Sequence, residues 1–274
     1  MKNIQIHQYE IPVAGIKKKT IYHFSDVHLS LYDEKSSEAE TERAKVRTGE
    51  WENTRKHFAN MHQEIYCEEN LETAETYFQK LIAQSNNGDF LLIAGDINDY
   101  YNGANFRCVN QMLKQLEVPF LYVSGNHEFL DATPNDPMFD FLKQPIQVLE
   151  QEDLIVVGVN NSNRLISSEQ NNKLLEILKM GKPVVILMHI PVLTAENEAT
   201  LRECGEYFYI NYDGAPKENF EFVEILKENA QTILGVFAGH LHFGNVSVIA
   251  PGLMQYVSSQ GILGICNRYV IGCD

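Results

Sequence analysis

The chain has 274 residues, of which 44% are hydrophobic, so it can bury a sizeable core and general disorder is excluded. Its formal net charge of −15 would repel a polyanion, which argues against nucleic-acid polymers and favours small-molecule partners. The five cysteines include no C-x-x-C pair, and from the N-terminal residues and the lengths of the apolar runs we expect neither a signal peptide nor a bilayer-spanning segment. We therefore expect reduced thiols, a cytoplasmic location and no membrane contact.

Short apolar runs, rich in β-branched and aliphatic residues, recur along the chain, and most have a turn residue nearby. Runs of this length and composition are typical of buried strands. The predicted strands, in chain order, are residues 20–24, 90–94, 120–123, 154–159, 184–188, 233–238, 246–249 and 255–257.

Between the first strands, the pattern predicts helices over residues 71–84, with Asn70 as the N-cap, and over residues 106–116. Strands and helices alternate early in the chain, whereas strands cluster late. We therefore expect an α/β sandwich with mixed sheets, built as a single domain over residues 1–274.

Two further helices are predicted in the second half of the chain. Ser167 and Gln170 have the spacing of a capping box, for a helix that ends before Gly181. The other covers residues 217–229, and its expected apolar face is formed by Phe220, Val223 and Leu226.

Residues 31–70 form a polar insertion between the first two strands. Their alternating charges are typical of solvated helices, here a helix pair. The insertion also holds several cations and two histidines: Arg43, Lys45, Arg47, Arg55, Lys56, His57 and His62.

Five predicted strands are followed directly by side chains that commonly bind metal ions. Because ligands gather beyond the carboxyl ends of strands in open α/β sheets, we expect these side chains to meet. The five loops are Ser25-Asp26-Val27-His28, Gly95-Asp96-Ile97-Asn98-Asp99, Gly125-Asn126-His127-Glu128, His189-Ile190-Pro191 and Gly239-His240-Leu241-His242.

The residue types in these loops favour one kind of ion. Carboxylates, imidazoles and an amide oxygen suit Mn, Fe or Zn, and the lack of cysteine argues against a structural zinc site. Two of the loops carry ligands two residues apart, a spacing that directs both side chains to one side at a strand end. Each short motif alone is usually a turn or a surface histidine, but five loops after five strands indicate a site.

This series of motifs, D-x-H, G-D-x-x-D, G-N-H-E, H-x-P and G-H-x-H, resembles the calcineurin-like metallophosphoesterase superfamily. The resemblance implies a four-layer αββα sandwich of two mixed β-sheets flanked by helices, with a dinuclear metal site at the carboxyl ends of the strands. It implies one metal ion on Asp26, His28 and His242, with Asp96 as the bridge, and a second on Asp96, Asn126, His189 and His240.

The resemblance also implies roles for residues beside the metals. His127 is the expected general acid and Asp99 orients its imidazole. Glu128 is expected to support the metal ligands, and Pro191 to fix the loop after His189.

The implied activity is hydrolysis of a small phosphate monoester or diester. Two divalent or trivalent ions about 3.5–4 Å apart can share a bridging hydroxide and neutralise the charge of the phosphoryl group. The insertion at 31–70 would then be either a solvated helical segment or a lid that brings cations near the substrate phosphate.

Two other functions stay open. Serine/threonine phosphoprotein phosphatases of this superfamily have an Arg after the second Asp of G-D-x-x-D, where this chain has Tyr100. Such a phosphatase is therefore the second hypothesis, and a non-catalytic, metal-stabilised binding scaffold is the third. Tyr100, Tyr101 and Asn102 either shape a substrate pocket or are ordinary loop residues. The oligomeric state and the native metal pair are left undetermined.

Overall fold

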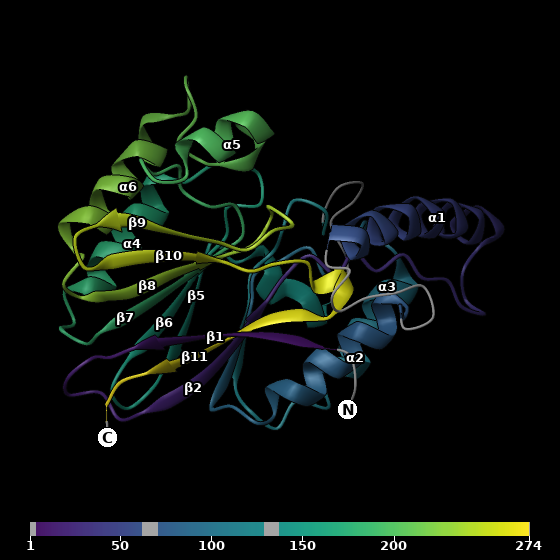
Figure 1. Ribbon diagram of the computed structural model, residues 1–274, viewed down its shortest axis with the longest axis horizontal. Coiled ribbons are helices and arrows are strands. Elements are labelled where there is room, and N and C mark those ends of the chain that lie inside the picture. Colours follow the sequence, from purple (N-terminus) through teal and green to yellow (C-terminus); the bar gives the residue numbers. More distant parts are fainter. Residues whose placement is uncertain (1–3, 62–70, 129–136, 274) are drawn as a thin grey trace.

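Two β-sheets lie face to face, with helices on the outer side of each (Figure 1). The computed structural model describes residues 4–61, 71–128 and 137–273. One sheet has five strands in the order β1-β11-β2-β3-β4, and the other has six in the order β5-β6-β7-β8-β10-β9. The predicted four-layer αββα sandwich is confirmed.

The strands of the first sheet are β1 (Gln5–Ile11), β2 (Lys19–Phe24), β3 (Phe90–Ile93), β4 (Phe120–Tyr122) and β11 (Ile265–Ile271). Those of the second are β5 (Ile146–Glu150), β6 (Ile155–Val159), β7 (Val184–Met188), β8 (Ile233–Ala238), β9 (Asn245–Ala250) and β10 (Leu253–Val257). The α-helices are α1 (Glu38–Met61), α2 (Ala74–Ser85), α3 (Gly103–Leu113), α4 (Ser168–Leu178), α5 (Glu198–Cys204) and α6 (Lys217–Glu228).

Both sheets are mixed, as expected. In the first sheet, β2, β3 and β4 run parallel to one another, and β2 pairs antiparallel with β11. In the second sheet, β7 and β8 are parallel. Since parallel neighbours end at the same edge, the loops after β2, β3 and β4 emerge together, as do those after β7 and β8.

The strands are apolar on both faces because both faces are covered. Ile21 of β2 points into the core between the sheets, where it meets side chains such as Leu187 and Phe237 of the second sheet. Phe24 points outward to Phe78 of α2, at a ring distance of 6.2 Å. Helices α4 and α6 cover the outer face of the second sheet in the same way. This double burial explains the continuous apolar runs in the sequence.

Three strands were not predicted: β1, β5 and β11. β1 and β5 lie at the edges of their sheets, where one side of the strand meets solvent. Their sequences mix polar and apolar residues, so they lack the apolar run of a fully buried strand. β11 lies inside its sheet, but Asn267 and Arg268 interrupt its apolar pattern.

The starts of two predicted helices are corrected by their caps. α2 begins at Ala74, after the N-cap Thr73, whose hydroxyl accepts a hydrogen bond from the Thr76 amide. The expected cap, Asn70, lies outside the described residues. α3 begins at Gly103, three residues earlier than predicted, because the Asn102 side chain caps it.

The later helices match their predicted extents, with one error in a buried face. The capping box of Ser167 and Gln170 opens α4 as predicted. On α6, however, Phe220 is 43% exposed, whereas Phe222 is buried beside Val223. Val223 and Leu226 are buried as predicted, and Phe222 takes the place that was expected for Phe220.

Within its described residues, 31–61, the polar insertion forms one long helix, α1 (Figure 1). The remainder of the expected helix pair would fall on residues 62–70, which lie outside the described residues. Within the described ranges, no helix is long and apolar enough to cross a membrane, and Cys108, Cys204, Cys266 and Cys273 are free thiols.

Candidate metal centre

The five predicted loops converge, but their backbone is not that of a continuing strand. Asp26, His28, Asp96, His240 and His242 all have φ between 52° and 73°. The left-handed region is uncommon for residues other than glycine, and it turns each loop sharply after its strand. Strand alternation therefore does not set the direction of these side chains: Asp26 and His28 face one group, whereas His240 and His242 face different groups, as the family resemblance implied.

The first group joins the loop after β2 to the loop after β8. Asp26 Oδ1 lies 3.3 Å from His242 Nε2 and 3.8 Å from His28 Nε2, and the two Nε2 atoms are 2.9 Å apart. Asp26 and His28 are buried. One carboxylate and two imidazoles thus converge on one point. They are three of the four ligands that the resemblance implied for the first metal, and Asp96, the expected bridge, belongs to the other group.

The second group joins the loops after β3, β4, β7 and β8. One ligand atom each from Asp96, His189 and His240 lies within 4.8 Å of the others. His189 Nε2 is 3.2 Å from Asp96 Oδ2 and 3.0 Å from Asn126 Oδ1. His189 Nδ1 bonds to the Ala94 carbonyl, so Nε2 is the nitrogen available to a metal.

Both groups fit a metal cation. Asp26 Oδ1, the atom that faces His28 and His242, is buried and has no hydrogen-bond partner among the described residues. Burial raises the pKa of Asp26, but the neighbouring His242 and His28 lower it well below its usual value. Burial likewise raises the pKa of Asp96, whereas His189 and His127 lower it. Two ionised carboxylates among imidazoles form a hard, oxygen- and nitrogen-rich site.

His127 lies beside these groups and contacts Asp99. Its Nδ1 is 2.9 Å from the Asp99 carbonyl oxygen and 3.1 Å from Asp99 Oδ1. Burial lowers the pKa of His127, but the charge of Asp96 and the bonds to Asp99 raise it to about 9. The pairing predicted for these two residues is therefore present in the geometry, and it leaves Nε2 of His127 free of that bond.

Arg47 of α1 binds the Asp99 carboxylate that contacts His127, and this role was not predicted. Arg47 Nε donates to Asp99 Oδ2 and Arg47 Nη2 to Oδ1, both at 2.6 Å. Burial raises the pKa of Asp99, but the bonds from Arg47 and His127 lower it. Asp99, His28 and His127 also form a compact group. Because the Asp99 carboxylate is held by a guanidinium, we do not assign a metal there.

Trp51, one turn further along α1, stacks on the metal-ligand candidate His28. Their ring centroids are 3.9 Å apart and the rings are nearly parallel, at 17°. Thr48 of the same helix donates its hydroxyl to the Ser30 carbonyl at 2.7 Å. The signal in the sequence was weak but present: Arg47, Thr48 and Trp51 share one helix face, and Trp51 is the single tryptophan in a polar segment.

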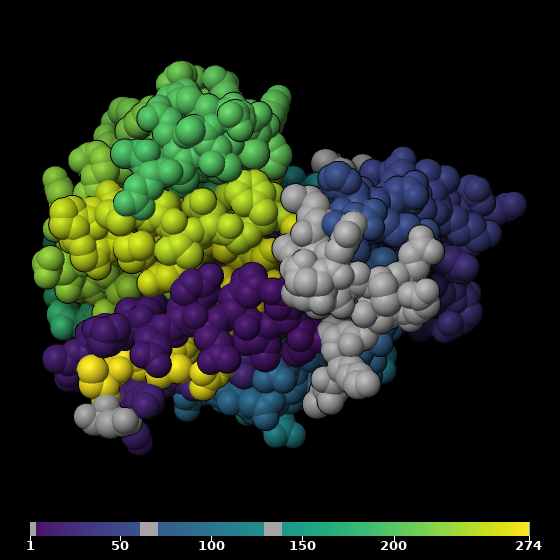
Figure 2. Space-filling view, viewed as in Figure 1, coloured from purple at the N-terminus to yellow at the C-terminus, as the bar shows by residue number. Residues whose placement is uncertain are grey.

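A second segment borders the site on the other side. His240 Nε2 is 2.9 Å from the carbonyl oxygen of Tyr207, in the short 3-10 helix Glu206–Phe208 after α5. Figure 2 shows the α5 segment in green and α1 in blue standing apart, with a notch in the outline between them. The candidate metal centre therefore contacts α1 on one side and the Glu206–Phe208 segment on the other.

Glu128 supports the site by fixing two of its loops. Its carboxylate accepts hydrogen bonds from the amides of Asp96, Ile97, Asn98 and Gly125 at 2.6–3.0 Å, and from the Tyr122 hydroxyl at 2.7 Å. Because a buried carboxylate with several amide donors is held rigidly, the loops after β3 and β4 keep a fixed separation. This contact pattern agrees with the supporting role that the sequence suggested.

Tyr100, which follows Asp99, is 2% exposed and therefore forms no wall of an open pocket. Its ring lies 4.1 Å from the Arg43 guanidinium, and its hydroxyl accepts a bond from Asn102, the N-cap of α3. For these two residues, the interpretation as structural loop residues is the one that agrees with the geometry.

The model of the calcineurin-like phosphoesterase family matches residues 19–244. The fold is similar to that of a dimetal phosphatase from Danio rerio, with 14% identity, a TM-score of 0.56 and coverage of 89% of this chain and 88% of that chain. It is also similar to purple acid phosphatase PPD1 from yellow lupin (Lupinus luteus) seeds, with 12% identity and a TM-score of 0.50; 90% of this chain but only 45% of that chain is covered. A search of curated proteins found no match.

The fold and the histidine–carboxylate cluster define an α/β metallohydrolase class. The family match spans most of the sequence and all five ligand loops, and the chain belongs to the calcineurin-like phosphoesterase family. Membership in that family makes metal-dependent hydrolysis of phosphate esters its class of activity.

Proposed function

We propose that this protein hydrolyses phosphate monoesters or diesters of small molecules with two transition-metal ions. The observation that carries the proposal is the presence of two adjacent ligand groups, one with Asp26 and one with Asp96, beside His127. When bound, the ions would neutralise phosphoryl charge and lower the pKa of a coordinated water. Mn, Fe and Zn all suit these ligands.

The assignment of individual residues belongs to the same proposal. Asp26, His28 and His242 would hold one ion, Asn126, His189 and His240 the other, and Asp96 both. His127 would donate a proton to the leaving oxygen through Nε2, since Nδ1 is bonded to Asp99. Asp99, fixed by Arg47, would hold the His127 imidazole in that orientation.

Neither competing function gains support from a specific contact. A non-catalytic scaffold does not require a proton donor, yet His127 is held by two contacts to Asp99 beside the ligand groups. A phosphoprotein phosphatase would bind a peptide, and the net charge of −15 offers no general attraction for phosphorylated, acidic partners. Small phosphate esters are therefore the class of substrate that we propose.

The test uses p-nitrophenyl phosphate and bis(p-nitrophenyl) phosphate with added Mn²⁺, before and after chelation. We expect turnover of at least one ester, lost on chelation and restored by metal. Asp96→Asn should bind fewer than two equivalents of metal and lose activity. Full metal loading of the parent protein without turnover of either ester would favour the scaffold, and two equivalents in Asp96→Asn would contradict bridging by Asp96.

A further inference from the structure

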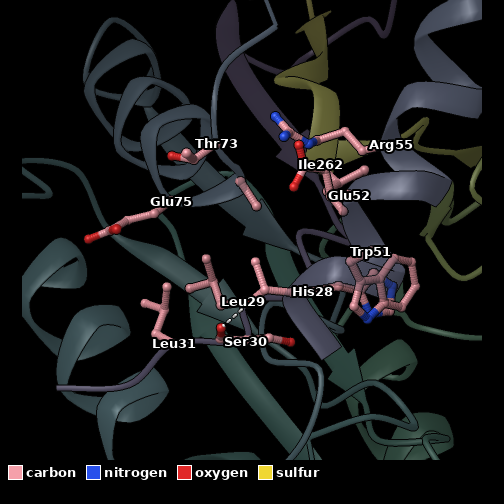
Figure 3. A pocket seen from close by; sticks show the side chains of 12 residues that line it. His28, Leu29, Ser30, Leu31, Trp51, Glu52, Arg55, Thr73, Glu75 and Ile262 are labelled. Atoms are coloured by element: carbon pink, nitrogen blue, oxygen red, sulfur yellow. Dashed lines mark hydrogen bonds between the residues drawn. The ribbon is translucent and has the colours of Figure 1, made fainter. Parts of the chain in front are cut away.

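A cavity of about 250 Å³ lies between α1 and the start of α2, next to the metal-ligand candidate His28 (Figure 3). Most of its lining is apolar, from Leu29, Leu31, Trp51, Ala74 and Ile262. His28 and Trp51 belong both to the cavity lining and to the stack at the candidate metal centre. A molecule in this cavity would therefore contact His28, a member of the first ligand group.

The cavity is lined by one buried cation, Arg55. Arg55 is only 9% exposed, and its Nη1 is buried without a hydrogen-bond partner among the described residues. A buried guanidinium N–H without an acceptor is costly, so the site is suited to a ligand that supplies one. Figure 3 shows Arg55 at one end of the cavity and Ser30 at the other, with Trp51 along the side.

The carboxylates that line the cavity leave Arg55 Nη1 without an acceptor, although the charge of Glu52 partly offsets the burial that lowers the pKa of Arg55. Glu52, 47% exposed, is paired with Lys56 Nζ at 3.4 Å. Figure 3 shows the Glu75 carboxylate directed away from Arg55 and Trp51. The cavity also includes Thr73 and Ala74, the N-cap and first residue of α2, and the positive end of that helix dipole favours an anion.

We propose that this cavity binds the alcohol part of the ester, and that it selects an apolar alcohol with an anionic group, a carboxylate or a second phosphate, which Arg55 binds. This assignment rests on the proposed hydrolase function. Since a cavity of about 150 Å³ can accept benzene, a cavity of about 250 Å³ has room for an aromatic ring with a short substituent. Trp51 and the leucines contact the ring, and the guanidinium contacts the acid.

The first test compares two esters that differ only in the remote group: 4-(2-carboxyethyl)phenyl phosphate and 4-(2-carbamoylethyl)phenyl phosphate. We expect kcat/KM of the parent protein to favour the carboxylate about tenfold, the usual size of a charge-assisted contact. Arg55→Met should abolish this preference while turnover of phenyl phosphate is retained, and Arg55→Lys should keep part of it. Lys45→Met, which removes an exposed cation of the same helix that does not line the cavity, is the matched control and should keep it in full.

The second test does not depend on catalysis. Trp51 is the only tryptophan, so its fluorescence reports directly on this cavity. We expect 3-phenylpropanoate to change that fluorescence at lower concentration than 3-phenylpropanamide in the parent protein, and at similar concentrations in Arg55→Met. 3-Phenylpropylphosphonate, which cannot be hydrolysed, in place of 3-phenylpropanoate tests the second possible acid.

Equal turnover of the two esters by the parent protein, or an undiminished preference in Arg55→Met, would overturn the assignment. If neither ester is hydrolysed, the proposed hydrolase function fails and the fluorescence titration decides the cavity by itself. A titration in which the acid and the amide bind alike, or neither binds, rejects the cavity as an anion-selective subsite.

Discussion

Arg47 and Asp99 join the inserted helix α1 to the loop after β3 through two hydrogen bonds of 2.6 Å. Asp99 in turn contacts His127, the proposed proton donor. Three residues from three segments of the chain thus form one line of contacts. The polar insertion, whose sequence pattern is typical of a solvated surface, therefore contacts residues of the proposed active site.

The first prediction concerns Arg47→Ala. Without the guanidinium, the Asp99 carboxylate keeps its contacts with Ser30 and His127 but loses two hydrogen bonds, so it holds the His127 imidazole less firmly. We expect kcat for an ester with a poor leaving group to fall about 10- to 100-fold, while the metal content stays at the parent value. Arg43→Met is the control, since it removes a cation of the same helix that faces Tyr100. Equal losses in both variants would show that only helix stability was affected.

The second prediction concerns His127→Ala. Since His127 is not assigned as a metal ligand, the variant should bind the same metal equivalents as the parent protein. Its kcat for phenyl phosphate should fall about 10²- to 10⁴-fold, the usual contribution of a general acid. The loss should be smaller for p-nitrophenyl phosphate, whose leaving group needs no proton. A variant that hydrolyses phenyl phosphate as well as the parent does would rule out the acid role.

The third prediction concerns Gly125, at which a Cβ would collide with the Asp96 carboxylate and lie 2.5 Å from the Asp96 amide nitrogen. Gly125→Ala must therefore displace the proposed bridging ligand. We expect metal binding to weaken at least tenfold and the free energy of unfolding to fall by about 1–3 kcal/mol. Metal titration and urea unfolding measure the two effects, and parent-like values for both would contradict this close packing.

The fourth prediction is the matched substitution on α1, Gly49→Ala. Gly49 lies within the helix, and a Cβ there has no atom within 4 Å. Alanine restricts the unfolded chain and favours helix, so the free energy of unfolding should rise by about 0.5–1 kcal/mol. Urea unfolding measures this gain, and activity should not change. Destabilisation would mean that α1 at this position is not helical in solution.

Local sequence patterns were sufficient for the elements whose signals are local. The buried strands that deliver the ligands, β2, β3, β4, β7 and β8, are short apolar runs. The capping box of α4 is a spacing of three residues. The edge strands β1 and β5 were missed because their residues are half-exposed and carry no apolar run. The buried face of α6 was misplaced because Phe220 and Phe222 have the same hydrophobicity, and only packing distinguishes them.

The sequence alone determined the ligand types and the strand ends that carry them, because each motif and the strand before it lie within a few neighbouring residues. Strand alternation could not show that His240 and His242 face different groups, which only the family resemblance implied, since their directions depend on left-handed backbone angles set by the surrounding loops. The sequence also could not place Arg47 on Asp99 or Trp51 on His28, because those contacts join segments separated by up to 52 residues. Such pairings arise only when the chain has folded and α1 has packed beside the ligand loops.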